Sequence, residues 1–177
     1  GSSLRRMFLR TPMRFGRISS RFQKARFHPI LKIRRPHLGV DYAAPTGTPI
    51  RAVGDGVVQI AGFRGGGGNT IKIRHNSVYE TAYLHLSRIN VRQGARVSQG
   101  QVIGHVGTTG LSTAPHLHFE FFQNGRYIDP LGKKFPSAEP VPTTMMSVFL
   151  AALQPSLQTL PPWPSQGCLL YTSDAAD

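Results

Sequence analysis

Two histidine-containing motifs in this sequence carry side chains that commonly bind metals. The run H-L-G-V-D places His37 and Asp41 four residues apart, and the later run H-L-H contains His116 and His118. Imidazole nitrogens and carboxylate oxygens are ligands of catalytic zinc, which keeps three protein ligands and leaves a fourth position for water. His37, Asp41 and His118 supply such a donor set, with His116 beside it.

The spacing of both motifs fits extended backbone. Side chains at positions i and i+2 of a strand point to the same face, so His116, His118 and Glu120 should share one face. The residues between them are apolar and form the expected core face: Leu117, Phe119 and Phe121. The histidine and aspartate of H-L-G-V-D also share one side, and Gly39 leaves room between them. Each motif alone is also typical of surface histidines, but together they favour one shared metal ion, steadied by Glu120.

A further histidine, His85, follows a strand-like segment in the run Y-L-H-L-S. Strict alternation predicts that Tyr83 and His85 lie on one face, opposite Leu84 and Leu86. An exposed histidine at a strand end suits general acid or base chemistry, because its unperturbed pKa lies near neutrality. The remaining histidines have no paired donor nearby and are interpreted as structural or surface residues: His28, His75 and His105.

The elements that must position these residues are short strands. Glycine and proline are abundant, at 19 and 14 residues, and valine and isoleucine cluster between them, which favours strands and tight turns over helices. Six segments are strand-like: Pro49–Val53, Gly56–Ala61, Thr70–Arg74, Glu80–Leu84, Gln101–Val106 and His116–Gln123. We therefore predict an all-β fold, a compact antiparallel sandwich or barrel.

Two segments, residues 47–58 and 94–104, share a cadence in which a glycine turn precedes valine or isoleucine. The second resembles the duplicated hybrid motif of the superfamily that includes biotinyl and lipoyl carriers. Those carriers attach their cofactor to a lysine at a hairpin tip, whereas this chain has no lysine between Lys72 and Lys133. A carrier function is therefore excluded.

The composition predicts four regions. We expect a basic lead-in packed on or near the core (residues 1–36), a strand-rich domain that carries the metal-binding motifs (37–132), a proline-rich tail with a short helix at 145–153 (133–166), and a non-native, adapter-derived tail (167–177) that contains the single cysteine, Cys168. With one cysteine, no internal disulfide and no cysteine-based zinc site can form.

Positive charge is concentrated in the lead-in. The formal net charge of the chain is +13. Residues 1–36 contain nine arginines, two lysines and no acidic residue, so most of this excess lies there. Such a block is typical of a solvated face or of contact with an anionic envelope surface. Nucleic acid is not an expected partner, because no reading helix, zinc finger or ribonucleoprotein motif accompanies the charge. No segment approaches the roughly 20 apolar residues of a membrane-spanning helix.

Three blocks together resemble the signature of the lysostaphin-type zinc metallopeptidases, which cut peptide bonds in peptidoglycan. They are R-R-P-H-L-G-V-D-Y-A-A-P-T-G-T-P-I, Y-L-H-L-S and G-T-T-G-L-S-T-A-P-H-L-H-F-E, and the match runs from about Arg21 to Leu131. The leader, with R-I-S-S-R-F and R-F-H-P-I-L, is similar to that of the Gram-negative murein DD-endopeptidases. The resemblance implies a monomeric enzyme of the periplasm or cell envelope whose export signal lies upstream of this chain.

The resemblance implies a role for each motif residue. The zinc ligands fall on His37, Asp41 and His118, and the non-ligand catalytic histidines fall on His116, as base, and His85, as oxyanion stabiliser, or with these two roles exchanged. The implied substrates are peptidoglycan stem peptides, cut at D-alanyl to diaminopimelate cross-links or at a pentaglycine bridge.

This interpretation has two alternatives, and the sequence departs from the family pattern at two positions. A non-catalytic, peptidoglycan-binding or hydrolase-activating relative would commonly lack a ligand, and none is missing here. Phosphotransfer by paired histidines leaves Asp41 unexplained. Gly67 stands where the family often has a groove-lining tyrosine, and Ala114 replaces a glycine, at a cost of about 1 kcal/mol if that position needs positive φ.

Overall fold

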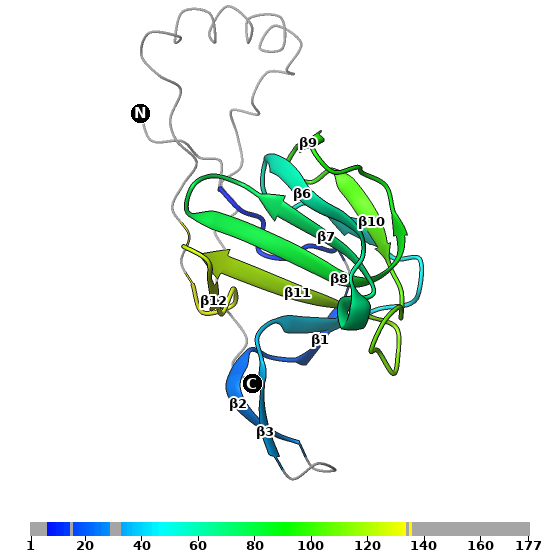
Figure 1. Cartoon of the computed structure of the whole chain (residues 1–177), viewed down its shortest axis with the longest axis vertical. Coiled ribbons are helices and arrows are strands. Elements are labelled where there is room, and N and C mark those ends of the chain that lie inside the picture. Colours follow the sequence, from blue (N-terminus) through cyan, green and yellow to red (C-terminus); the bar gives the residue numbers. More distant parts are fainter. Residues whose placement is uncertain (1–6, 15, 29–32, 134, 136–177) are drawn as a thin grey trace, which may run out of the picture. The chain divides into compact units, whose positions relative to one another are not determined.

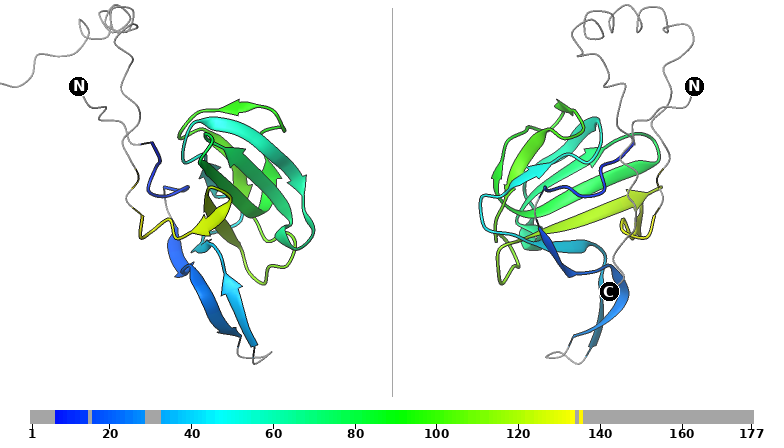
Figure 2. Two further views of the ribbon diagram at one scale, coloured as in Figure 1. Left: turned by 60° about the vertical axis from the view of Figure 1, so that its left-hand side comes forward. Right: turned by 180° about the vertical axis from the view of Figure 1, so that it is seen from behind.

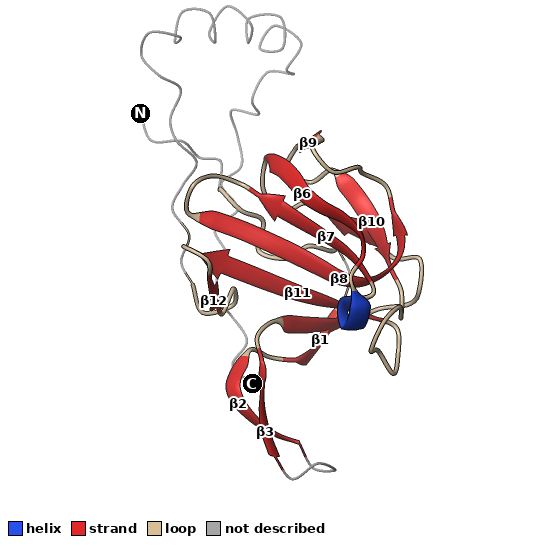
Figure 3. Ribbon diagram, in the orientation of Figure 1, coloured by secondary structure: helices blue, strands red, loops and turns tan. Residues whose placement is uncertain are grey.

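The computed structural model describes residues 7–14, 16–28, 33–133 and 135. Regular structure in these residues is β apart from one short 3-10 turn, η1 (Gly65–Gly67), as Figure 3 shows. The predicted all-β, antiparallel class is confirmed. The predictions for the proline-rich tail, its helix, and the terminal segment with Cys168 lie outside the described residues. The described part of the chain contains no helix of sufficient length and apolarity to cross a membrane.

Ten strands form one antiparallel sheet (Figure 1). Its main path runs β1-β4-β11-β8-β7-β6-β9, while β10 pairs with β5 and β8, and β12 pairs with β11. The strands are β1 (Arg17–Ser20), β4 (Val40–Ala43), β5 (Pro49–Arg51), β6 (Gly56–Phe63), β7 (Asn69–Arg74), β8 (Tyr79–Ile89), β9 (Arg96–Val97), β10 (Val102–Val106), β11 (His116–Gln123) and β12 (Arg126–Ile128). A separate ribbon pairs β2 (Gln23–His28) with β3 (Ile33–His37).

The turn from β11 to β12 shows how local sequence sets the register. Asn124 and Gly125 both have positive φ, at 50° and 72°, and Gln123 pairs directly with Arg126 across the two-residue loop. An Asn-Gly pair suits such a loop, because asparagine and glycine tolerate positive φ better than other residues. β11 is therefore bordered by β12 at one end and by β4 at the other.

The core lies on the face of β11 opposite its histidines. Leu117, Phe119 and Phe121 are almost fully buried, and Tyr83 of β8 packs its ring against Phe119 at a centroid distance of 5.3 Å. His116, His118 and Glu120 alternate with them and are only half-buried, as the i, i+2 spacing predicted. Phe122 belongs to the histidine face but is also buried, under Lys72 and Tyr127.

The segment before β1 also contributes to the core. Phe8 and Met13 are buried, and the Phe8 ring makes edge contacts with His75, Tyr79 and Phe121 at centroid distances of 5.0, 5.4 and 5.1 Å. The backbone of Leu9 donates a hydrogen bond to the carbonyl of Val53. The right-hand view of Figure 2 shows residues 7–14 running across this side of the sheet.

Candidate metal centre

Strand pairing brings the two histidine motifs together. β11 lies beside β4, with His118 directly opposite Asp41 and His116 opposite Ala43. On its other side β11 pairs with β8, where Leu84 stands opposite His118. His37 ends β3, three residues before β4 begins. The antiparallel register therefore places residues separated by some 80 positions in the chain at the same point of the sheet.

Asp41 lies at the middle of the cluster. Its Oδ1 is 2.7 Å from His118 Nδ1, and its Oδ2 is 3.0 Å from His37 Nε2. One potential ligand atom from each of these three residues lies within 4.8 Å of the other two, so a single ion can contact all three. The Nε2 atom of His116 is 3.9 Å from Asp41 Oδ1, next to this group. The structure thus brings together the three residues that were predicted as ligands.

Hydrogen bonds at the back of each ring fix which nitrogen faces the cluster. The Nδ1 atoms of His37, His116 and His85 each lie 2.8 Å from a backbone carbonyl, of Arg21, Ala114 and Thr109 respectively. A carbonyl only accepts, so each Nδ1 carries the proton and each Nε2 keeps its lone pair. His118 has the reverse orientation, because its Nδ1 faces Asp41 and its Nε2 lies 3.4 Å from Glu120.

The chemistry of the donors fits a divalent cation. His37 Nε2 is buried yet makes no hydrogen bond of acceptable geometry, although Asp41 Oδ2 is 3.0 Å away. A buried lone pair without a donor is costly, and a cation removes that cost. A metal site usually contains a carboxylate and imidazole nitrogens whose lone pairs point inward. It also has carboxylates or backbone carbonyls that hold the rings from behind. The described residues therefore support a metal centre.

The pKa values of the cluster reflect the attraction between the Asp41 carboxylate and a positive charge. Burial would raise the pKa of Asp41, but the neighbouring rings of His118 and His37 hold it well below its usual range. Burial would also lower the pKa of His118, but the Asp41 and Glu120 carboxylates outweigh it and raise the pKa to about 9. The carboxylate thus strongly favours a positive charge on its neighbours, and a metal ion competes with protons for this position.

His85 reaches the cluster by a route that alternation did not predict. Tyr83 and Leu86 are both in the core, whereas the His85 ring lies 4.8 Å from the ring of His116 and 6.2 Å from that of His118. The prediction that Tyr83 and His85 share a face is therefore wrong. A β-bulge is the cause, since the register between β7 and β8 shifts at this point and His85 has a φ of 63°. Bulges of this kind re-aim side chains beside active sites.

The surroundings of His85 also differ from the expected exposed strand end. The residue is buried, with 8% of its surface exposed. Burial lowers its pKa, the Thr109 carbonyl opposes the shift, and the positive charges of His116 and His118 add to it. Thr109 is a positioning residue that sequence reasoning missed: its Oγ1 accepts a hydrogen bond from the Asn69 backbone and donates one to the Leu86 carbonyl. The G-T-T-G run gave no signal for this role.

Glycine is required where β3 turns into β4. A Cβ atom on Gly39 would lie 2.7 Å from the His118 ring and 2.7 Å from the Phe119 carbonyl oxygen. The predicted need for close approach at Gly39 is confirmed. Ala114, by contrast, is not among the described non-glycine residues with positive φ, so the strain considered for it does not arise. Gly67 lies in η1, beside Thr70 and Leu84.

The remaining histidines with described side chains lie outside the cluster. His75 donates through Nδ1 to the Asp55 carbonyl, and its Nε2 is 2.8 Å from Thr81 Oγ1. His105 stands in β10, where its Nδ1 is buried without a hydrogen-bond partner. His75 therefore has a structural setting, in line with its interpretation.

Comparison with known sequences gives a family match and a close relative. The model of peptidase family M23 matches residues 35–130, more than half of the chain. The peptidoglycan DD-endopeptidase ShyC of Vibrio cholerae serotype O1 is 42% identical over 160 residues, which cover 90% of this chain and 37% of that protein. The chain thus spans little more than a third of the length of this relative.

Solved structures share the fold. A zinc-containing peptidase from Vibrio cholerae superposes with a TM-score of 0.72 at 41% identity, covering 75% of this chain and 42% of that one. The catalytic domain of lysostaphin from Staphylococcus simulans superposes with a TM-score of 0.59 at 36% identity, covering 66% of this chain and 90% of that domain. The described fold is therefore similar to most of the lysostaphin catalytic domain.

Proposed function

This chain belongs to peptidase family M23, and we propose that it is a zinc-dependent endopeptidase that hydrolyses peptide cross-links of bacterial peptidoglycan. The observation that carries the proposal is the convergence of His37, Asp41 and His118 on one point, with two further histidines beside them. The Vibrio cholerae relative is named a peptidoglycan DD-endopeptidase, and a similar structure is named a zinc-containing peptidase. The first name supports a peptidoglycan bond between two D-centres, such as the D-alanyl to diaminopimelate cross-link, and the second supports zinc.

The three ligands we assign are His37 through Nε2, Asp41 through its carboxylate and His118 through Nδ1. Bound zinc supplies Lewis acidity, which activates water and polarises the scissile carbonyl. Glu120 and the Arg21 carbonyl hold the rings of His118 and His37 from behind, so the site needs little rearrangement to bind an ion.

The proton transfers fall to the two histidines that are not ligands. His116 presents a lone pair at Nε2 next to Asp41, so it can take a proton from the attacking water. His85 lies at a centroid distance of 4.8 Å from His116. Because burial lowers the pKa of His85, its protonated form gives up a proton more readily than an ordinary imidazolium. That form suits charge stabilisation on the oxyanion and proton delivery to the leaving amine. Exchange of these two roles is the alternative assignment.

Two substitutions separate ligand from base. His118→Ala should abolish both stoichiometric zinc binding and turnover of purified sacculi, because it removes a ligand. His116→Ala should retain zinc and lose turnover by about 10²- to 10⁴-fold, the usual contribution of a general base. Zinc content by mass spectrometry and muropeptide analysis of the digests provide the measurements. Stoichiometric zinc in His118→Ala would contradict the ligand assignment.

The same digests test the competing function and the type of bond. Cross-linked muropeptides that stay whole with zinc-loaded protein would favour a non-catalytic, peptidoglycan-binding relative. Products cut between D-alanine and diaminopimelate would support the proposed specificity, whereas cleavage only of pentaglycine bridges would contradict it. We further propose action in the periplasm or cell envelope, where this substrate lies, with the basic residues of the lead-in (1–36) in contact with anionic envelope surfaces.

A further inference from the structure

A row of directly paired residues crosses five strands of the sheet. Phe122 of β11 stands opposite Glu80 of β8, and Glu80 stands opposite Arg74 of β7. Val57 of β6 is paired with Arg74 on one side and with Arg96 of β9 on the other. Residues paired in this way point to the same face of an antiparallel sheet. Since Phe122 shares its face with His118, both arginines belong to the face that carries the metal centre.

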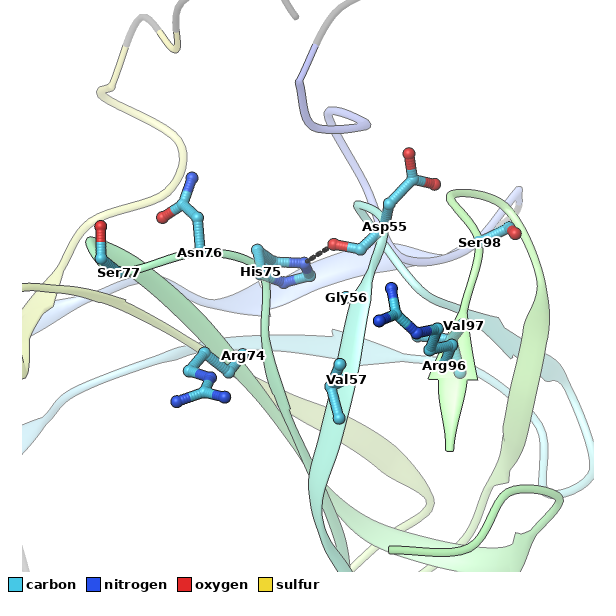
Figure 4. A pocket seen from close by; sticks show the side chains of 10 residues that line it. All are labelled: Asp55, Gly56, Val57, Arg74, His75, Asn76, Ser77, Arg96, Val97 and Ser98. Atoms are coloured by element: carbon cyan, nitrogen blue, oxygen red, sulfur yellow. Dashed lines mark hydrogen bonds between the residues drawn. The ribbon is translucent and has the colours of Figure 1, made fainter. Parts of the chain in front are cut away.

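Arg74 and Arg96 line a pocket of about 890 Å³ at the far end of this face. Figure 4 shows their side chains on either side of Val57. Both arginines are exposed, and among the described residues neither guanidinium forms an ion pair. Each side chain therefore keeps hydrogen-bond donors for a bound group, and exposed hydroxyls of Ser77 and Ser98 line the same pocket.

The acidic residue in the lining does not neutralise the arginines. Oδ1 of Asp55 accepts a hydrogen bond of 2.7 Å from the Gln99 backbone, and Figure 4 shows the Asp55 carboxylate turned away from both guanidinium groups. Glu80, which neighbours Arg74 in the row, is paired with Lys72 at 2.9 Å. The pocket thus carries two positive charges, and no carboxylate from the described part of the chain pairs with either of them.

The distance from the metal centre suits an extended peptide. In β8, Leu84 pairs with His118 of β11, and Glu80 pairs with Arg74 of β7. Arg74 therefore lies two strands away from His118 and four residues further along the strand direction. With strands about 4.8 Å apart and about 3.4 Å per residue, the two Cα positions are separated by about 17 Å. Four extended residues span about 14 Å, and an arginine side chain adds reach. A peptide held at the metal ion therefore reaches Arg74.

We propose that Arg74 and Arg96 bind a free carboxylate of the peptide that lies across the sheet from the metal centre. This inference rests on the proposed function, since the stem peptides of peptidoglycan carry free carboxylates on their glutamate and diaminopimelate residues. The arginines supply forked donors that match a carboxylate, and they hold the uncut arm of the cross-link. They act on substrate affinity and selectivity and stay remote from the reacting bond.

The test compares binding of soluble, cross-linked muropeptides with free and with amidated carboxylates. The double variant R74Q/R96Q is examined in the His116→Ala background, so that the peptide stays intact. Exposed charge pairs give two- to fivefold each, so we expect Kd to rise about tenfold for the free-carboxylate peptide and to change little for the amidated one. The rise should shrink in high salt, which screens exposed charges. Arg126→Gln is the matched control, because it pairs with Gln123, which lies on the other face.

The outcomes separate this inference from the proposed function. An unchanged Kd in the double variant, or an equal rise for the amidated peptide, would overturn the carboxylate site. A background protein that binds neither muropeptide would overturn it as well. If the chain with His116 intact binds the muropeptide but does not cut it, while R74Q/R96Q weakens binding selectively, the carboxylate site stands and the endopeptidase proposal fails. With cleavage present, R74Q/R96Q should raise KM and leave kcat unchanged.

Discussion

At the scale of single residues, the candidate metal centre depends on how closely the β3–β4 turn approaches β11. His118 is held between Asp41 on one side and Glu120 on the other, and Gly39 lies next to its ring. The Phe119 carbonyl closes the same space from the backbone, so it cannot move aside as a flexible side chain could. A methyl group at residue 39 would therefore act on the position of His118.

Gly39→Ala should weaken metal binding without removing a ligand. We expect the affinity for zinc to fall about 10- to 100-fold, as for other changes that displace a ligand from behind. Overpacking should also destabilise the fold by about 1–3 kcal/mol. A competition titration with a chelator and thermal unfolding measure the two effects. Gly62→Ala is the control, because its Cβ would meet nothing within 4 Å. Equal zinc affinity in both variants would speak against close packing at residue 39.

At the scale of elements, the bulge in β8 delivers His85 to the site. The left-handed conformation of His85, with φ at 63°, is uncommon for a residue with a side chain and carries strain. Thr109 compensates in part, since its carbonyl binds Nδ1 and its hydroxyl joins β7 to β8. The bulge thus lowers the stability of the fold slightly, and it places an imidazole beside His116.

Glycine and alanine at residue 85 should separate backbone strain from chemistry. Both His85→Gly and His85→Ala should lose turnover, but the glycine variant should be more stable by about 1 kcal/mol, because only glycine adopts positive φ freely. Denaturant unfolding provides the comparison. At Ala82, which pairs in unbroken register with Glu120 and Lys72, the substitution Ala82→Gly should instead destabilise the fold. A more stable His85→Ala would mean that the bulge is not strained.

The sequence allowed the longer strands of the central sheet to be predicted, but not the shortest strands or the bulge in β8. All six predicted strands are present, because valine, isoleucine and aromatic residues alternate between glycines. The face of β11 followed from the same alternation, and with it the positions of His116 and His118. The face on which His85 lies could not be predicted in this way, since the bulge depends on how β8 pairs with β7. Arg17–Ser20, Arg96–Val97 and Arg126–Ile128 are too short to stand out in composition.

At the scale of the whole domain, residues 7–14 pack against the sheet like part of the core. Phe8 is 3% exposed and meets four aromatic rings, those of His75, Tyr79, Phe121 and Phe135. Its neighbour Leu9 is 38% exposed. We predicted that this basic lead-in packs on or near the core, but the alternation of Met7, Phe8 and Leu9 was too short to show which of them is buried.

Phe8→Ala should therefore destabilise the fold with little effect on the chemistry. We expect a loss of about 3–5 kcal/mol in the free energy of unfolding, as for other buried aromatic residues. Leu9→Ala should change stability by less than about 0.5 kcal/mol, as at other exposed sites. Chemical denaturation gives both values, and zinc content at low temperature should be normal in the two variants. A loss below 1 kcal/mol for Phe8→Ala would show that residues 7–14 do not anchor the domain.

His75 connects this anchor to a buried polar chain. It packs against Phe8, donates to the Asp55 carbonyl, and meets Thr81, whose hydroxyl lies 3.2 Å from that of Tyr83. Val53 donates its backbone N–H to the same tyrosine hydroxyl. Burial lowers the pKa of His75 below its ordinary 6.5, against the opposing effects of the Asp55 backbone and the charges of Asp55 and Glu80.

The stability of the domain should fall in acid because of this histidine. Below pH 6.5 the unfolded chain binds a proton at residue 75 that the folded domain resists, so stability is retained above pH 6.5 and declines as pH falls towards the lower folded pKa. His75→Gln keeps a donor and an acceptor but cannot titrate. In urea unfolding between pH 7.5 and pH 5, the wild type should lose more stability than the variant. Parallel pH profiles would show instead that His75 is protonated as readily in the folded domain as in the unfolded chain.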